Sequence, residues 1–452
     1  MNSSIHKIID RDKDKLIAAL QENVRIPSTE GAPEANAPFG RNVRLALDHA
    51  LAEGAKLGFR TVDMEGYVGC IEYGEGSEMV GVVCHLDVVP EGEGWTHDPY
   101  GAEIADGNMY GRGTLDDKGP AFCALYAMAA IKESGIPLRR RIRIILGTNE
   151  ETGWGCMKYY AKHGEAPTLG FTPDGDYPLV NSEKGICQND FKKSFRSNIR
   201  VKAGTRPNVV AGRTDVFVPV CREKVEKAIE DARLEGFTYE FFDCENGTSF
   251  RVNGLEAHGA SPELGKNSVQ AALCVLDLLK LEGEDGEMVS VLHKALGMSI
   301  HGEDLGLDVT DASGRLTLNV GVIDWDENGI NSLQTDCRHP ISVKAQHVID
   351  TQVKAYGMER VGGKCQDPLF VPADSELVTK LLDVYAAHTG TRPAPKAIGG
   401  GTYARAFKNV VAFGAEIPGH PAPIHMPDEF IPIEDLMFDA HVIADAMVAL
   451  AE

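Results

Sequence analysis

Apolar residues follow two alternating patterns between residues 58 and 185. Short β-branched runs bounded by Gly or Pro predict buried strands at 79–84, 142–146 and 168–171. An Ala-rich helical stretch covers residues 121–132. Strands that alternate with helices are typical of a mostly parallel sheet covered by helices. This part of the chain is therefore predicted to have an α/β fold.

The pattern changes between residues 186 and 365. Short β-branched runs recur at 198–201, 214–218 and 316–322, and a helical stretch covers 268–280. Runs of strands mixed with separate helices predict an α+β unit rather than a continuation of the parallel sheet. We interpret this segment as a large insert.

The α/β pattern resumes from residue 375 and ends in a helix. The apolar residues of this helix lie on one stripe and comprise Leu436, Ala440, Ile443, Met447 and Leu450. The predicted organisation is therefore discontinuous. Residues 1–185 and 366–452 are predicted to form one discontinuous domain, and residues 186–365 an inserted domain.

Composition narrows the class of protein. The chain has 452 residues, of which 43% are hydrophobic, and its net charge of -22 argues against nucleic acid and anionic membranes as partners. We see no apolar run long enough for a transmembrane helix, and the start lacks the apolar core of a signal peptide. The ten cysteines form no C-x-x-C pair. These features predict a cytoplasmic enzyme with reduced cysteines.

Acidic residues and a histidine gather where the predicted strands end. They comprise His85 and Asp87 after 79–84, Asp116 and Asp117 before the helix at 121–132, Glu150 and Glu151 after 142–146, and Asp174 after 168–171. Adjacent carboxylates repel each other, so their position at strand ends indicates a cation. Carboxylates and imidazole without paired cysteines suit zinc, manganese or cobalt. Taken alone, the His85-x-Asp87 pair is equally consistent with a capped strand end.

The order of these motifs resembles the M20 family of dinuclear metallopeptidases, and within it a group of bacterial dipeptidases. The motifs are HLDVVP from His85, GRGTLDDKGP from Gly111, NEETG from Asn149, PDGD from Pro173, and His425 followed by Glu429. The resemblance extends over nearly the whole chain. It implies an α/β catalytic domain with an inserted lid.

The resemblance also implies a role for each residue at the strand ends. His85, Asp116 and Asp174 would bind one divalent ion, and Asp116, Glu151 and His425 the second, so that Asp116 bridges. Glu150 would be the general base, Asp87 and Asp117 would support the ligands, and the Asp116–Asp117 peptide would be cis. Zinc is the favoured ion, with manganese and cobalt open.

Further residues resemble substrate-binding positions of the family. In the insert, His258 would stabilise the oxyanion, Arg338 would bind the substrate carboxylate, and Asn208 matches a third position. Without the metal motifs, we would interpret them as a core histidine, a surface arginine and a turn asparagine. The loop Gly399, Gly400, Gly401 and Thr402 precedes a predicted helical stretch. It lacks a Walker lysine, so it favours a substrate carboxylate over a nucleotide.

The implied function is hydrolysis of dipeptides with free termini, with a metal-activated water as the nucleophile. Two alternatives remain open. One is another amidohydrolase of the family, such as a succinyl-diaminopimelate desuccinylase or an N-acyl amino acid deacylase. The other is an inactive metal- or peptide-binding protein, against which Glu150 argues because binding needs no base. The expected partner is a small peptide, with no nucleic acid or membrane. The long lid implies a monomer, since it would replace a dimer partner.

Overall fold

A computed structural model describes residues 2–452, which form two compact units. The first unit comprises the chain up to Asn181 together with Phe370–Lys396 and Gly401–Glu452. The second comprises Ser182–Leu369 and the short segment Ala397–Gly400. The divisions at 181 and 369 lie close to the predicted domain boundaries. The inclusion of Ala397–Gly400 in the second unit was not expected.

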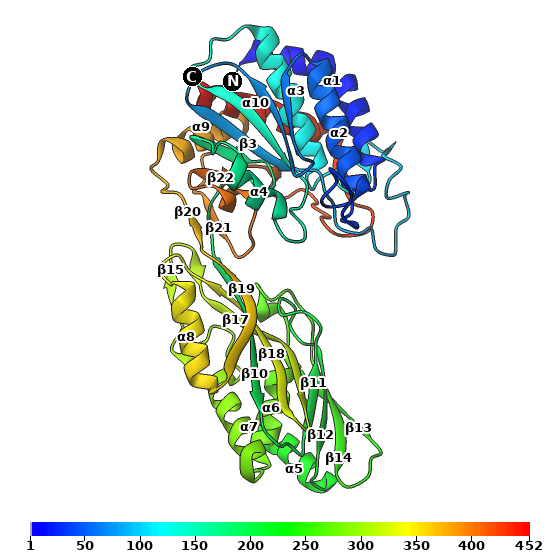
Figure 1. Ribbon diagram of the computed structural model, residues 1–452, viewed down its shortest axis with the longest axis vertical. Coiled ribbons are helices and arrows are strands. Elements are labelled where there is room, and N and C mark those ends of the chain that lie inside the picture. The colour runs from blue at the N-terminus through cyan, green and yellow to red at the C-terminus, as the bar shows by residue number, and fades with distance from the viewer. Residues whose placement is uncertain (1) are drawn as a thin grey trace. The chain divides into compact units, whose positions relative to one another are not determined.

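The main sheet of the first unit has parallel strands at its centre and antiparallel strands at its edges (Figure 1). Its nine strands follow the order β1-β2-β6-β3-β7-β22-β9-β20, with β21 paired to β9. Strand β3 is parallel to both β6 and β7, and β7 is parallel to β22. The strands are β1 (Arg60–Met64), β2 (Val68–Tyr73), β3 (Met79–His85), β6 (Arg141–Gly147), β7 (Leu169–Thr172), β9 (Val180–Glu183), β20 (Leu369–Phe370), β21 (Lys396–Ile398) and β22 (Val410–Ala412).

Helices lie on both faces of this sheet. Ile144 of β6 lines a small cavity together with Phe122 of α3, whereas its neighbour Arg143 donates to the Tyr160 hydroxyl of α4. Since adjacent residues of a strand point to opposite faces, α3 and α4 cover different faces. The helices are α1 (Ser3–Val24), α2 (Arg41–Lys56), α3 (Lys118–Ser134), α4 (Gly155–His163), α9 (Glu376–Thr389) and α10 (Ile433–Ala451). The predicted α/β fold class is confirmed.

The strand predictions in the first unit agree closely with the structure. Strands β3 and β6 each contain the run predicted for them, and β7 lies one residue later than predicted. All five stripe residues of α10 are buried, as expected of a helix that packs its apolar face against the core. The remaining short strands are β4 (Glu103–Ala105), β5 (Asn108–Tyr110), β8 (Gly175–Asp176), β23 (Ala415–Glu416) and β24 (Phe430–Pro432).

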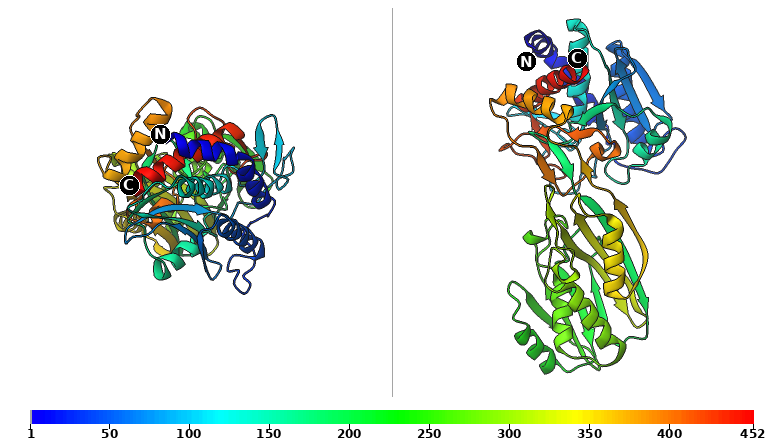
Figure 2. Two further views of the ribbon diagram at one scale, coloured as in Figure 1. Left: turned by 90° about the horizontal axis from the view of Figure 1, so that it is seen from above. Right: turned by 90° about the vertical axis from the view of Figure 1, so that its left-hand side faces the viewer.

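The second unit is built on an eight-stranded antiparallel sheet of order β13-β14-β12-β11-β17-β18-β10-β19. The strands are β10 (Gly185–Ser194), β11 (Arg200–Ala203), β12 (Arg213–Val218), β13 (Thr238–Phe242), β14 (Thr248–Asn253), β17 (Thr317–Asp326), β18 (Gly329–His339) and β19 (Glu359–Gln366), with a small hairpin of β15 (Thr310–Asp311) and β16 (Gly314–Arg315). A hydrophobic core lies between this sheet and its helices (Figure 2).

The helices of the second unit are α5 (Arg222–Ala232), α6 (Ser268–Leu278), α7 (Gly283–Leu296) and α8 (Ala345–Tyr356), with single 3₁₀ turns η1 (Pro262–Leu264) and η2 (Glu303–Leu305). Helix α6 begins where Asn267 caps it, because the Asn267 side chain accepts hydrogen bonds from the N–H groups of Val269 and Gln270. An antiparallel sheet with separate helices is the α+β arrangement predicted for the insert.

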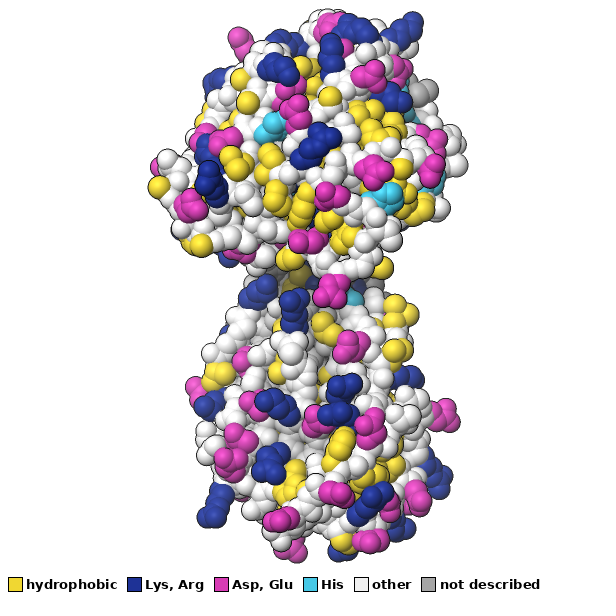
Figure 3. Space-filling model, turned by 90° about the vertical axis from the view of Figure 1, so that its right-hand side faces the viewer, with side chains coloured by type: hydrophobic (Ala, Val, Ile, Leu, Met, Phe, Trp, Pro, Cys, Tyr) yellow, Lys and Arg dark blue, Asp and Glu magenta, His cyan; other side chains and the backbone are white. Residues whose placement is uncertain are grey.

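The surface carries charges of both signs. On the face shown in Figure 3, Lys and Arg side chains are interspersed with Asp and Glu over both units. Within residues 2–452, no helix combines the length and the apolar character needed to cross a membrane.

We expect the stripe of α10 to contribute strongly to stability. Ile443 is fully buried, whereas Leu45 of α2 is 43% exposed. Ile443→Ala should lower the free energy of unfolding by about 2–5 kcal/mol, because it removes buried methyl groups and leaves a cavity. Leu45→Ala, the matched control, should change it by less than about 0.5 kcal/mol. Urea unfolding of both variants measures the difference, and equal stabilities would contradict the packing described for α10.

Candidate metal centre

The carboxyl ends of three neighbouring parallel strands bring the predicted ligands of the first unit together. Strand β3 ends at His85, and Glu151 and Asp174 follow β6 and β7 after short turns. Asp116 lies in the loop that leads into α3. Because parallel strands present their carboxyl ends at one edge of the sheet, these side chains meet there. His425 joins them from the loop before β24.

Asp116 is shared by two groups of potential ligands. Its Oδ1 lies 2.9 Å from His85 Nε2, and its Oδ2 lies 3.0 Å from His425 Nε2. Asp174 Oδ2 is 3.7 Å from His85 Nε2, and Glu151 Oε1 is 3.2 Å from His425 Nε2. In each group of three residues, the potential ligand atoms all lie within 4.8 Å of one another.

The donor chemistry fits two divalent cations. Three carboxylates and two imidazoles supply only nitrogen and oxygen atoms, which suits zinc, manganese or cobalt. Burial, together with the nearby Asp116 carboxylate, raises the pKa of Asp174 to about 7. Burial likewise raises the pKa of Glu151, with Asp116 contributing. Each carboxylate thus makes the ionised form of its neighbour less stable. Cations bound between the carboxylates would stabilise their ionised forms.

Backbone and side-chain contacts orient His85. Its Nδ1 lies 2.9 Å from the carbonyl oxygen of Asp87 and 3.6 Å from Asp87 Oδ1. A proton on Nδ1 therefore donates to the carbonyl, which leaves the Nε2 lone pair for a ligand. The backbone N–H of His85 donates to Asp117 Oδ2 at 3.0 Å. The Asp116–Asp117 peptide is cis, as the family resemblance implies.

The Asp87 carboxylate also binds the backbone that follows β6. Its Oδ1 accepts a hydrogen bond from the Glu150 N–H at 3.0 Å, and its Oδ2 accepts one from the Glu151 N–H at 3.1 Å. Asp87 therefore fixes the backbone that carries both glutamates, and both its carbonyl and its carboxylate lie next to His85. The sequence did not indicate the contacts of the Asp87 carboxylate with the N–H groups of Glu150 and Glu151, because these residues lie far from Asp87 along the chain.

Glu150 lies beside the ligands without belonging to either group. The indole N–H of Trp154 donates to Glu150 Oε1 at 3.1 Å. Withdrawal from water raises the pKa of Glu150 well above its ordinary range, and the neighbouring carboxylates Asp174 and Glu151 act in the same direction. A carboxylate of raised pKa is a stronger base, which is the property that general-base catalysis needs.

Glu429 holds the loop that carries Asp116, a role that we did not predict. This fully buried carboxylate accepts hydrogen bonds from Arg112 Nη1 at 2.6 Å and from the backbone N–H groups of Gly113, Leu115 and Asp116 at 3.0–3.3 Å. The sequence pointed to Glu429 only as the end of a motif. The sequence shows only an arginine between two glycines, and its burial in the structure is what requires a carboxylate partner.

Tyr403 is a second residue that we did not predict. Its ring lies edge-on to His85 and Trp154, with centroids 6.0 and 5.6 Å apart, and its hydroxyl lies 2.8 Å from Cys156 Sγ. It follows Thr402 in the single 3₁₀ turn η3 (Tyr403–Ala406), where Thr402 Oγ1 accepts from the Ala404 N–H. The helical stretch predicted after the glycine loop is thus a single 3₁₀ turn.

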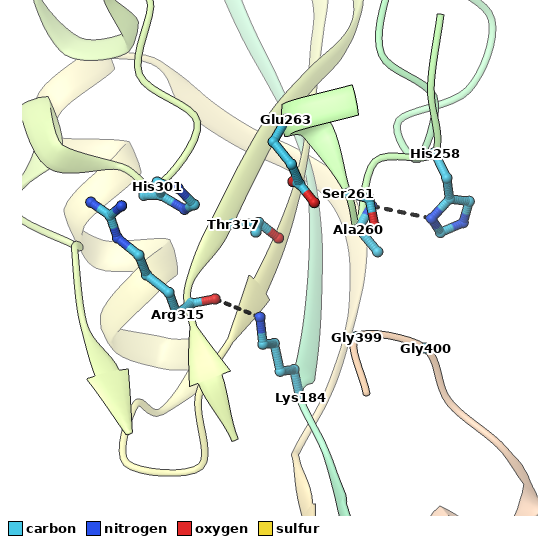
Figure 4. Close-up of a pocket in the computed structure, with 10 residues that line it drawn as sticks. All are labelled: Lys184, His258, Ala260, Ser261, Glu263, His301, Arg315, Thr317, Gly399 and Gly400. Atoms are coloured by element: carbon cyan, nitrogen blue, oxygen red, sulfur yellow. Dashed lines mark hydrogen bonds between the residues drawn. The ribbon is translucent and has the colours of Figure 1, made fainter. Parts of the chain in front are cut away.

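In the second unit, His258 lies at a pocket of about 520 Å³ (Figure 4). The pocket is lined by Lys184, His258, Ala260, Ser261, Glu263, His301, Arg315, Thr317, Gly399 and Gly400. His258 Nδ1 accepts a hydrogen bond from the Ala260 N–H at 3.2 Å, so the neutral ring carries its proton on Nε2. Burial and the nearby Arg338 lower the pKa of His258, which favours this neutral donor form.

Arg338 and Asn208 also belong to the second unit. The Nε and Nη2 atoms of Arg338 each donate to Asp336 at 2.8 Å, and its Nη1 donates to the Gly399 carbonyl at 3.0 Å. The Nε and Nη2 side of the guanidinium is thus held by Asp336. The backbone of Asn208 accepts a hydrogen bond from the Gly259 N–H at 2.7 Å, next to His258. The glycine loop is divided, since Gly401 and Thr402 belong to the first unit.

Comparisons with known proteins agree with the sequence resemblance. A model of peptidase family M20/M25/M40 matches residues 81–449. The chain is 37% identical to "Putative dipeptidase YtjP" of Bacillus subtilis over 98% of each sequence. It is 31% identical to the Beta-Ala-Xaa dipeptidase of Lactobacillus delbrueckii subsp. lactis over 100% of this chain and 99% of that one. The crystal structure of human carnosine dipeptidase 1, at 16% identity and a TM-score of 0.60, covers 99% of this chain and 98% of its own, and it shares the fold.

We expect Glu429 to be required for both stability and the position of Asp116. Glu429→Gln removes the charge that Arg112 faces in a buried site, which should cost about 3–5 kcal/mol of unfolding free energy. The variant should also bind zinc more weakly, because the loop that carries Asp116 loses its anchor. Glu434→Gln, an exposed change in α10, is the control. Urea unfolding and zinc titration measure both effects, and an unchanged zinc affinity in a folded Glu429→Gln protein would contradict the anchoring role.

Proposed function

Because this chain belongs to peptidase family M20/M25/M40, we propose that it is a two-metal dipeptidase acting on peptides with free termini. The observation that carries the proposal is the pair of ligand groups that share Asp116, with Glu150 beside them. The name of the Lactobacillus delbrueckii relative gives Beta-Ala-Xaa dipeptides as its substrates. We include such dipeptides among the substrates of this chain.

His85, Asp116 and Asp174 would hold one ion, and Asp116, Glu151 and His425 the other. Two divalent cations at these residues would lower the pKa of a water molecule and polarise the scissile carbonyl. Zinc is favoured, with manganese or cobalt as alternatives, because all the donors are nitrogen and oxygen atoms.

Glu150 would take the proton from the attacking water and later deliver it to the leaving amine. Its raised pKa and its hydrogen bond from Trp154 suit both steps, since the group must accept a proton and then release it. Asp87 contributes by holding the Glu150 N–H, which limits movement of the base. A protein that only bound metal or peptide would need no such base.

We assign the substrate-binding roles to the second unit. His258 would donate its Nε2 proton to the carbonyl oxygen as negative charge develops there. Arg338 would bind the C-terminal carboxylate through the N–H groups that Asp336 leaves available, with Asn208 and the loop Gly399, Gly400, Gly401 and Thr402 completing this end. In this proposal the second unit acts as a lid, and the enzyme functions as a monomer with a small peptide as its partner.

Other amidohydrolases of the family share the proposed metal ligands, so substrate assays must distinguish them. We would remove metal with a chelator, reload the enzyme with zinc, manganese or cobalt, and assay dipeptides, tripeptides, N-succinyl and other N-acyl amino acids. Activity should disappear with the metal and return on reloading, and dipeptides should be the best substrates. Faster hydrolysis of N-succinyl amino acids would replace the dipeptidase proposal with a deacylase.

The base is tested by Glu150→Gln, which keeps the size of the side chain and removes its ability to take a proton. The turnover number should fall by at least about 10²–10⁴-fold, while zinc content and fold remain unchanged. Glu133→Gln, a change of an exposed glutamate on α3, should leave turnover as it is. Near-normal turnover in the Glu150→Gln enzyme would exclude Glu150 as the base.

Carboxylate recognition is tested by Arg338→Ala. Free dipeptides should lose more kcat/KM than the corresponding C-terminal amides, because only the acid gains from the guanidinium. Part of the loss should appear in kcat, since binding energy remote from the scissile bond drives closure. The control is Arg315→Ala, because Arg315 lines the pocket beside which His258 lies but pairs with Asp308 and Glu303. Equal losses for acid and amide would argue against this role.

A further inference from the structure

A second group of potential metal ligands lies in the first unit, where three helices meet. His6 comes from the first turn of α1, His388 from the last turn of α9, and Asp445 from α10. His6 Nε2 lies 3.0 Å and His388 Nε2 lies 2.8 Å from the same atom, Asp445 Oδ2. Their potential ligand atoms all lie within 4.8 Å of one another. None of these residues belongs to the candidate metal centre or to the mechanism proposed above.

We propose that His6, His388 and Asp445 form an additional transition-metal site that connects the two ends of the chain. Two imidazole nitrogens and one carboxylate oxygen are donors that suit zinc, cobalt, nickel or copper, and they suit calcium and magnesium poorly. Three protein ligands leave room for water to complete the coordination.

The spacing of this group matches that of the catalytic candidates. The contacts of Asp116 with His85 and His425 measure 2.9 and 3.0 Å, against 2.8 and 3.0 Å around Asp445. A tetrahedral zinc ion with bonds of about 2.0–2.1 Å needs neighbouring ligands about 3.3 Å apart. The two contacts of Asp445 with the histidines would therefore lengthen by only a few tenths of an ångström to hold an ion.

Surrounding contacts prepare the group for a cation. The Asn2 N–H donates to Asp445 Oδ1 at 3.0 Å, which orients the carboxylate and directs Oδ2 towards the histidines. The His6 ring stacks on His441 with centroids 4.4 Å apart, and His441 Nε2 lies 2.9 Å from Asp10 Oδ1. The negative end of the α9 dipole, near His388, also favours positive charge, whereas the positive end of the α1 dipole, near His6, opposes it.

The group is enclosed yet open to exchange. The side chains of His388 and Asp445 are 7% and 8% exposed, and that of His6 is 17% exposed. The ligands are thus largely fixed by packing, while an ion could still enter from solvent. Because α1 and α10 are the first and last helices, an ion here would hold the termini of the first unit together.

The site is tested by zinc stoichiometry in the full-length protein. After chelation, each protein is dialysed against zinc and its metal content is measured. The unmodified chain should bind one zinc ion more than His388→Ala, and His388→Ala should keep its dipeptidase activity because His388 lies outside the proposed mechanism. His347→Ala, an exposed change on α8, is the matched control and should keep the full zinc content. Equal zinc content in the unmodified and His388→Ala proteins would overturn the proposal.

A second experiment separates this site from the catalytic candidates. The double variant His85→Ala/His425→Ala should retain one zinc ion, and adding His388→Ala should remove it. Zinc should raise the thermal unfolding temperature of the double variant but not of the triple variant. If His388→Ala does not fold by circular dichroism, His6→Gln takes its place, because it removes a ligand and keeps a polar side chain of similar size. Absence of zinc from a folded double variant would also overturn the proposal.

Discussion

The Asp116 carboxylate is the group on which the candidate metal centre depends. Each of its oxygens faces a different histidine, so the two ligand groups exist only while this one side chain keeps its orientation. Burial opposes its charge, but contacts with His425 and His85 hold the pKa of Asp116 below its ordinary range. Two histidines thus keep one carboxylate ionised where burial alone would favour protonation.

Two buried acids that are not themselves proposed ligands supply the rigidity that this arrangement needs. Glu429 binds Arg112 and three backbone N–H groups of the loop that carries Asp116, and Asp87 binds the N–H groups of Glu150 and Glu151. Each carboxylate fixes a loop by accepting bonds from the backbone, which costs no side-chain freedom in the residues it holds. The proposed ligands and base therefore project from loops that are fixed by hydrogen bonds.

The second unit prepares its own residues in a comparable way. The Ala260 N–H sets the tautomer of His258, and Asp336 holds one edge of Arg338 while Nη1 binds Gly399. Side chains that are already oriented lose less freedom on binding, which favours the substrate roles proposed for them. The pocket of His258 is also lined by Lys184 and His301, which no motif had indicated.

The sequence by itself determined the buried strands β3 and β6 and the stripe of α10, because each depends on a pattern within a short stretch of chain. It also determined the family and the fold class, because both depend on the order of such patterns along the chain. It also identified the five candidate ligands, since their motifs are local. The tertiary structure alone decided that Glu429 anchors the Asp116 loop, that Asp336 holds Arg338, that the glycine loop is divided between the units, and that His6 meets His388 and Asp445. These contacts mostly join residues far apart along the chain, and their geometry comes from how helices and strands pack, which local periodicity does not encode.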